Sequence, residues 1–193
     1  QVAACDLHPG YISTVWARRY AEQLAIPLVQ VQHHHAHIVG LMAEHALPPD
    51  ARVIGVSFDG TGLGTDGAIW GGELLLAGYA DFERIGHLKY APLPGGDAAI
   101  KRPYRMALAH CYAAGIEWAV DLPPVQAARG NELANLRTQL SRRIACPDTS
   151  SAGRLFDAVA SMLDVRQVVS YEAQGAMELE ALAASAGASA GNA

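Results

Sequence analysis

Cysteine is scarce in this sequence, and no two cysteines form a CxxC pair. There are three in 193 residues: Cys5, Cys111 and Cys146. An odd number without close spacing argues against a disulfide framework and against a structural zinc ribbon. Reduced, unpaired thiols are typical of the cytosol, so we expect a cytoplasmic protein.

Basic charge is also scarce, and long uninterrupted apolar runs are absent. Lys and Arg number 14 against 19 Asp and Glu, which gives a formal net charge of -5 without a basic stripe. This balance argues against sequence-independent binding of nucleic acid. Charged residues, His or Gly interrupt the longest apolar stretches, so we expect neither a signal peptide nor a membrane-spanning segment. Hydrophobic residues nevertheless make up 51% of the chain, enough for a sizeable core.

Strand and helix signals alternate in the first quarter of the sequence. We expect a strand over residues 2–6, a helix capped by Ser13 or Thr14 that ends near Leu24, a strand over 28–32 and a helix over 38–46. The prolines at 48 and 49 indicate a hinge over residues 48–52.

The remainder intermixes strands and helices, which predicts an α/β fold class. A strand from residue 53 ends at Asp59 and is followed by two more strands in a β-meander. A rigid loop over 92–97 precedes helices, one of which stops at Gly115. The expected strands cover residues 68–79 and 82–90, and the expected helices 103–114, 131–145, 153–163 and about 172–184.

We expect that the sequence is cut from a longer protein at both ends. The chain opens with Gln1 rather than methionine and enters an apolar run directly. Residues 185–193 are small and lack a large apolar side chain, so we expect a frayed tail there.

Four of the eight histidines lie within residues 33–37. On a helix, His33 and His37 share one face, and this spacing lets two imidazoles bind one cation. His34 and His35 are expected to point elsewhere. A solvated histidine-rich turn and a relic of an affinity tag are the simpler alternatives, but the cluster is internal and lies between apolar segments. Two imidazoles and a carboxylate suit iron or zinc equally.

Asp59 and the glycines that follow it form a second candidate site. Gly60 and Gly62 would let main-chain N–H groups approach an anion, and Thr61 offers a hydroxyl. Asp59 could bind a metal, or the loop could hold a nucleotide phosphate with Asp59 nearby. By itself the motif is weak and fits an ordinary hairpin turn better, but the adjoining histidine cluster favours a binding site.

A third candidate is the predicted helix that opens at Gly153 behind a serine cap. Unpaired N–H groups at a helix N-terminus can bind phosphate, and Asp157 lies one turn further on, where it could accept hydrogen bonds from a ribose. The simpler interpretation is an ion pair between Arg154 and Asp157 on a solvated face, which contributes about 0.2–0.5 kcal/mol.

Six segments in this order resemble the HypF-type carbamoyltransferases of hydrogenase maturation. They span nearly the whole chain: ACDLHPGY from residue 4, QHHHAH from 32, FDGTG from 58 with IWGGE from 69, PLPGGDAA from 92, SSAGRLFDAVA from 150 and YEAQ from 171. One departure is Ala173, where the family tends to have glycine.

The resemblance implies an actin-like (ASKHA) fold, related to the TsaD-type tRNA threonylcarbamoyl transferases. Residues 1–48 would close the first lobe, and residues 52–184 would begin the second. The family's HxxxH metal pair corresponds to His33 and His37, with Asp59 as a third ligand of one divalent metal, iron or zinc. Nucleotide binding would involve Gly60, Thr61, Gly62, Gly153 and Asp157.

The resemblance also implies a reaction and its partners. Carbamoyl phosphate and ATP would form carbamoyl adenylate, and the actin-like module would pass the carbamoyl group to the C-terminal cysteine of a HypE-type acceptor protein. Several parts of the family are absent from this sequence: an Asn-Asp-Gly-Gly segment with a further aspartate ligand, the acylphosphatase-like, zinc-finger and YrdC-like domains, and the first lobe's phosphate loop. We therefore expect the chain by itself to be inactive.

Two other functions fit the same residues. An O-carbamoyltransferase of natural-product tailoring would use this module with an alcohol acceptor. A non-catalytic interaction module would bind the metal without affinity for adenylates. A tRNA-modifying role fits less well, because the DGTG and PGGD segments resemble HypF more than TsaD.

Overall fold

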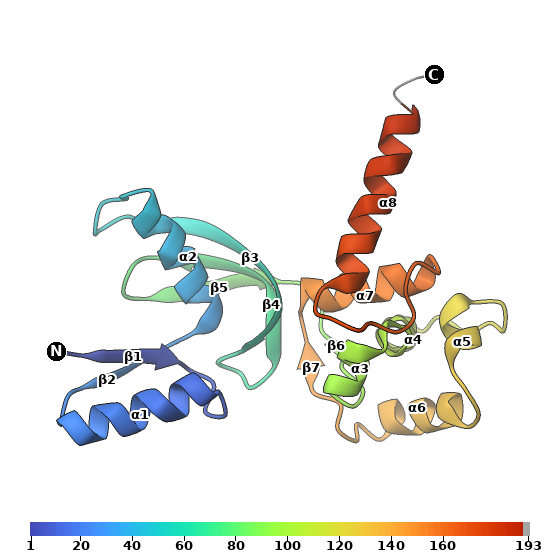
Figure 1. The fold of residues 1–193 in the computed structure, drawn as a ribbon, viewed down its shortest axis with the longest axis horizontal. Coiled ribbons are helices and arrows are strands. Elements are labelled where there is room, and N and C mark those ends of the chain that lie inside the picture. The colour runs from blue at the N-terminus through green and yellow to red at the C-terminus, as the bar shows by residue number, and fades with distance from the viewer. Residues whose placement is uncertain (191–193) are drawn as a thin grey trace. The chain divides into compact units, whose positions relative to one another are not determined.

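The computed structural model describes the main chain of residues 1–190 and the side chains of residues 1–186. It forms two compact units, Gln1–Leu88 and Lys89–Ala193, each with its own hydrophobic core (Figure 1). The predicted division into residues 1–48 and 52–184 rests on the resemblance rather than on compactness, and it stays a prediction.

The first unit begins with a β–α–β–α segment. Its elements are β1 (Ala3–Asp6), α1 (Ile12–Leu24), β2 (Leu28–Val31) and α2 (His33–Glu44). The two strands pair in parallel, with Asp6 opposite Val31. Helix α1 ends where Ala25 takes a left-handed conformation, two residues before Pro27. The parallel pairing therefore brings the end of β1 next to the chain that enters α2.

An antiparallel meander completes this unit: β3 (Val53–Leu63), β4 (Ile69–Ala77) and β5 (Phe82–His87). Helix α2 packs on one face of the meander, where Ile38 and Met42 join a core with Trp70 and Leu75. The alternation of β3 is clear, since Ile54, Val56 and Phe58 lie on the exposed face.

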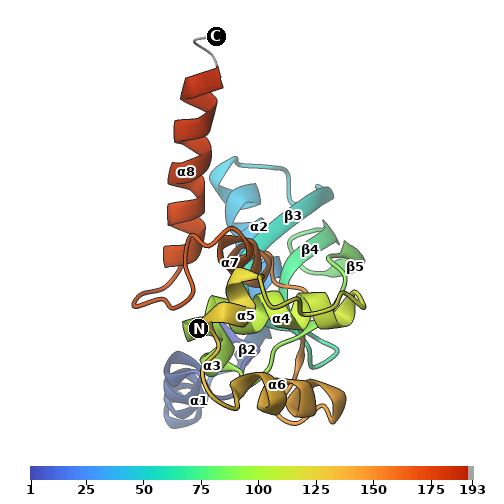
Figure 2. The ribbon, with the colours of Figure 1, turned by 90° about the vertical axis from the view of Figure 1, so that its right-hand side faces the viewer.

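The second unit is mostly helical. Helix α4 packs against α5, α6 and α7, and α7 in turn packs against α8 (Figure 2). The core of the unit includes Tyr104, Leu108, Leu136 and Leu140. Its elements are β6 (Ala91–Pro92), α3 (Asp97–Lys101), α4 (Pro103–Ala113), α5 (Pro123–Ala127), α6 (Glu132–Ser141), β7 (Asp148–Thr149), α7 (Ala152–Met162) and α8 (Gln174–Ala190).

The sequence predicted most of these elements but erred in several places. Tyr11, without a side-chain hydrogen bond, precedes α1, so the predicted Ser13 or Thr14 cap was wrong. Gly115 follows α4 with a φ of 69°, as predicted for its stop. The short elements α3, α5, β6 and β7 were missed, and α8 continues past residue 184 to Ala190. Residues 191–193 of the predicted frayed tail lie outside the described residues.

None of the helices within residues 1–190 combines the length and the apolar character that a membrane span requires.

Replacing Gly55 by alanine should destabilise the first unit. The added Cβ would lie 2.3 Å from Cδ1 and 2.6 Å from Cγ1 of Ile38, which is itself buried. Overpacking of this kind costs about 1–3 kcal/mol. Urea denaturation would measure the loss. Gly40→Ala is the matched control: Gly40 lies on α2 with open space around it, so alanine should stabilise by about 0.5–1 kcal/mol. Equal stability of the two variants would contradict the packing argument.

Glycine at position 173 should stabilise the second unit. Ala173 has a φ of 61°, in the left-handed region that costs a non-glycine residue roughly 1–2 kcal/mol. The greater freedom of glycine in the unfolded chain offsets about 0.5–1 kcal/mol of this. We expect Ala173→Gly to raise the free energy of unfolding by up to about 1 kcal/mol in thermal or urea denaturation. Ala183→Gly, on the exposed face of α8, should lower it; a loss in both variants would refute the interpretation.

Candidate functional site

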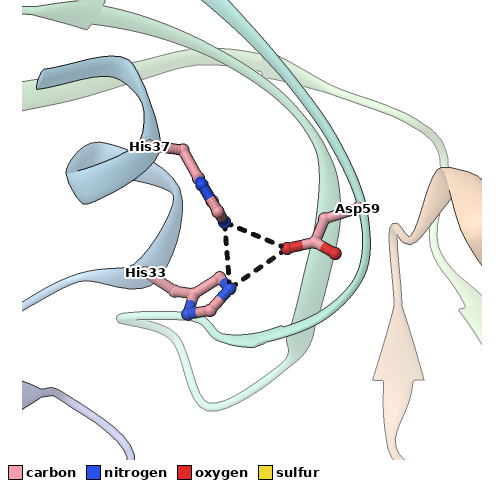
Figure 3. A group of neighbouring side chains, drawn as sticks. All are labelled: His33, His37 and Asp59. Atoms are coloured by element: carbon pink, nitrogen blue, oxygen red, sulfur yellow. Dashed lines mark hydrogen bonds and ion pairs between the residues drawn. The ribbon is translucent and has the colours of Figure 1, made fainter. Parts of the chain in front are cut away.

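The first two turns of α2 and the strand β3 bring His33, His37 and Asp59 together (Figure 3). The Nε2 atoms of His33 and His37 are 3.2 Å apart. Oδ2 of Asp59 lies 3.1 Å from Nε2 of His33 and 3.5 Å from Nε2 of His37. The two histidine rings lie on one face of α2, as their spacing predicted, and both point toward the carboxylate of Asp59.

These three separations are close to those of ligands around one small cation. Metal–ligand bonds of roughly 2.0–2.2 Å in tetrahedral geometry place the donor atoms roughly 3.3–3.6 Å apart. Two imidazoles and one carboxylate are a donor set that zinc and iron(II) both accept. The side chain of His37 is 59% exposed, which leaves this side of the group open to solvent.

Two local features set the start of α2 against β3. The side chain of Gln32 caps the helix by accepting a hydrogen bond from the His35 main chain, and its amide nitrogen donates to the carbonyl of Leu63 on β3. Gly62 allows the close approach, because a Cβ there would lie 2.5 Å from Cε1 of His34 and 3.1 Å from Cβ of His33.

Asp59 lies within a strand rather than at its end, so the prediction that the strand ends at Asp59 was wrong. Strand β3 continues to Leu63. Phe58 pairs with Gly72 and Gly62 with Trp70, so three residues of β3, 59–61, face the single residue Gly71. This bulge turns the Asp59 side chain toward the histidines.

Buried Glu73 stabilises the strand opposite the bulge. Its Oε1 accepts hydrogen bonds from the main-chain N–H groups of Gly71 and Gly72, at 3.1 Å each. Its Oε2 accepts one from Nε of Arg84 at 2.6 Å, and the Arg84 guanidinium stacks over Trp70 at 4.0 Å. Because Glu73 is fully buried, these partners compensate for the hydrogen bonds with water that its side chain loses on folding.

Sequence reasoning missed two residues near the histidine pair. Oδ2 of Asp6 lies 2.7 Å from Nδ1 of His33. Burial, and then the charges of Asp6 and Asp59, raise the pKa of Tyr11, so its phenol lies within electrostatic range of both carboxylates. Both residues belong to the ACDLHPGY segment. Their distance from the histidines in the sequence gave no indication that they lie near them in the fold.

The other two histidines differ from each other. His35 points away, with Nε2 2.8 Å from the carbonyl of Gly78, as expected. His34 is buried, with Nδ1 3.1 Å from the Gln32 amide nitrogen and Nε2 3.8 Å from Oδ2 of Asp59. Loss of hydration on burial lowers the pKa of His34 to about 4, against the opposing effect of Asp59. It is therefore a neutral residue behind the cluster, closer to it than predicted.

The glycine-rich segment has partners of its own within the first unit. The N–H of Gly60 donates to Oδ1 of Asp59 at 2.6 Å, and Gly62 faces the histidines. These contacts orient Asp59. Nucleotide binding by Gly60, Thr61 and Gly62 stays a prediction.

In the second unit, α7 opens behind Ser151, whose hydroxyl accepts a hydrogen bond from the main-chain N–H of Arg154, as predicted. Gly153 lies in the first turn. Arg154 and Asp157 form the expected pair, with Nη2 and Oδ2 3.0 Å apart, but the prediction of a solvated face was wrong: their side chains are 8% and 5% exposed.

The buried pair is incompletely hydrogen-bonded. Nε of Arg154 and Oδ2 of Asp157 have no hydrogen-bond partner among the described residues, so their 3.0 Å contact is an ion pair of poor hydrogen-bond geometry. Loss of hydration raises the pKa of Asp157 to about 6, although Arg154 opposes this. An acceptor in this state is compatible with a ligand hydroxyl, and ribose binding by Asp157 stays a prediction.

Comparison with models of known protein families identifies the family of this chain. Residues 55–192 match the family model described as carbamoyltransferase, Kae1-like domain, second subdomain, and residues 1–44 match the HypF Kae1-like domain. This chain belongs to the HypF carbamoyltransferase family.

Similar proteins that carry the HypF name support this assignment to the family. The chain is 46% identical to a carbamoyltransferase HypF homolog of Cupriavidus necator, over 95% of this chain and 46% of that protein. It is also 46% identical to carbamoyltransferase HypF of Rhodobacter capsulatus, over 97% of this chain and 25% of that protein. The chain thus spans less than half the length of either relative.

A solved structure confirms the predicted α/β, actin-like fold class. The crystal structure of full-length HypF in the phosphate- and nucleotide-bound form matches with a TM-score of 0.80 and 46% sequence identity, over 93% of this chain and 27% of that chain. The phosphate and nucleotide belong to that protein.

The pKa of Asp157 makes a testable contribution to stability. Folding raises this pKa from an ordinary value of about 3.9 to about 6, so the protonated form favours the fold. The contribution is complete below pH 4 and is lost as pH rises through 6, with a magnitude of up to about 3 kcal/mol. We expect the free energy of unfolding, relative to Asp157→Asn, to fall by that amount from pH 4 to 7. Urea denaturation across this range measures it, and a difference independent of pH would be evidence against the raised pKa.

Proposed function

We propose that this chain forms part of a carbamoyltransferase that acts in hydrogenase maturation. The enzyme would transfer a carbamoyl group from carbamoyl adenylate, made from carbamoyl phosphate and ATP, to the C-terminal cysteine of a HypE-type protein. The observation that carries this proposal is the triangle of His33, His37 and Asp59, with donor separations of 3.1–3.5 Å.

In the proposed site, His33, His37 and Asp59 hold one divalent metal, iron or zinc. When bound, such a cation polarises a carbonyl oxygen and stabilises negative charge that develops on it. The bulge in β3 and the cap at Gln32 fix the three donors before any substrate arrives, so little reorganisation is needed. The exposed side of His37 gives a substrate access to the cluster.

The transfer itself is a substitution at the carbamoyl carbon. The cysteine thiolate of the acceptor forms the new carbon–sulfur bond, and the bond from that carbon to the phosphate oxygen breaks, which releases AMP. Gly60, Thr61 and Gly62, together with Gly153 and Asp157, are the residues proposed to hold the nucleotide part. Binding of the leaving group at a fixed position would convert the transfer into an effectively unimolecular step.

His33→Ala and His37→Ala, each in the complete protein, should abolish metal binding and carbamoyl transfer together. Each substitution removes one of three ligands, so the loss of affinity should exceed the roughly 10–100-fold cost of losing a partner outside the ligand set. Elemental analysis and transfer of labelled carbamoyl to the acceptor protein are the two measurements.

His45→Ala provides the matched control, because His45 is exposed at the end of the same helix and should leave both properties intact. Full metal content and full turnover in either ligand variant would remove that histidine from the site. Equilibrium dialysis with ATP separates the enzyme from a non-catalytic module, which would bind the metal and not the nucleotide.

A further inference from the structure

The ACDLHPGY segment carries a carboxylate that the ligand set does not use. Asp6 ends β1, and the parallel pairing of β1 with β2 places it opposite Val31, two residues before His33. A further main-chain bond, from the N–H of Leu7 to the carbonyl of Val31, fixes this register at 2.9 Å. The fold therefore holds Asp6 beside the first ligand from outside the cluster.

The carboxylate of Asp6 has two acceptor atoms, and each has one partner. Oδ1 accepts a hydrogen bond from the main-chain N–H of His8 at 2.7 Å. Oδ2 lies 2.7 Å from Nδ1 of His33, and the Asp6 side chain is 16% exposed. An ionised carboxylate can only accept, so Nδ1 of His33 must carry the proton in this contact.

When the ring is neutral, its other nitrogen has a free lone pair. In a neutral imidazole with its proton on Nδ1, Nε2 is an acceptor. That lone pair is directed toward Oδ2 of Asp59 and Nε2 of His37, at 3.1 and 3.2 Å. A cation held between these three atoms would need that lone pair, because a ring nitrogen that carries a proton cannot bind a metal.

We propose that Asp6 is a positioning residue, which holds the His33 ring with its proton on Nδ1 so that Nε2 is free to bind the cation. The inference rests on the proposed function, because it assumes a cation between His33, His37 and Asp59. Asp6 itself does not touch the cation; it acts through His33.

Asparagine at position 6 tests this assignment with almost no change in size. The main-chain N–H of His8 can only donate, so it retains the amide oxygen of the asparagine. The NH2 group then faces Nδ1 of His33, which must become the acceptor, and the ring proton moves to Nε2. The variant thus directs a proton at the position of the cation.

Two measurements on the complete protein read out the effect. Two-bond ¹H–¹⁵N spectra of the metal-free protein show which ring nitrogen of His33 carries the proton, and calorimetric titration with Zn²⁺ gives the affinity. We expect the proton on Nδ1 in the unmodified protein and on Nε2 in Asp6→Asn, with Zn²⁺ affinity lower by roughly 10–100-fold in the variant.

Thr14→Val separates positioning from a general loss of structure. The Thr14 hydroxyl donates to the main-chain carbonyl of Asp6 at 3.3 Å, so valine loosens the same turn and leaves the carboxylate in place. Its affinity for Zn²⁺ should match that of the unmodified protein. An equal loss in Thr14→Val and Asp6→Asn would overturn the proposal, as would an Asp6→Asn affinity within twofold of the unmodified protein.

The outcomes also distinguish this inference from the proposed function. If the unmodified protein bound no Zn²⁺ or Fe²⁺, the cation site in the proposed function would be refuted. The position of the proton on His33 would still test the role of Asp6. A proton found on Nε2 in the unmodified, metal-free protein would overturn the role of Asp6 whatever the metal affinity.

Discussion

The close approach of helix α2 to strand β3 is the constraint on which the candidate site depends. Gly55 and Gly62 lie at the two ends of this contact, and neither leaves room for a Cβ against Ile38 or the histidines. Glycine weakens a strand by itself, so its use here indicates that close packing outweighs that cost. The approach brings side chains of the first helical turn within 3–4 Å of a strand carboxylate.

A buried charge network maintains the irregular strand that this approach requires. The bulge interrupts the ladder between β3 and β4 next to Gly71, and Glu73 satisfies two main-chain N–H groups at that place. Arg84 balances the charge of Glu73, and its guanidinium also contacts Asp66 and Trp70. Buried ion pairs seldom add stability over apolar residues, so this network is better explained by the specific strand geometry that it enforces.

The sequence predicted what depends on local spacing and missed what depends on pairing across the chain. His33 and His37 share a helix face whatever surrounds them, and Gly115 ends α4 in the expected conformation. Asp59 followed by two glycines has the composition of a turn, yet the chain stays in β3 because Gly62 pairs with Trp70. Asp6 meets His33 only through the β1–β2 register, 27 residues away in sequence. Arg154 and Asp157 have the spacing of a surface pair, and only the packing of α7 buries them.

The residues proposed to bind the cation and two of those proposed to bind the nucleotide lie in different units. His33, His37, Asp59 and Asp6 all lie in the first unit, on α2, β3 and β1, so the proposed cation site is assembled by contacts of that unit. Gly153 and Asp157 lie in the second unit, where buried Asp157 is ion-paired with Arg154. Substitution of Gly153 or Asp157 should therefore leave the proposed cation binding intact, whereas Gly60, Thr61 and Gly62 lie in the first unit beside Asp59.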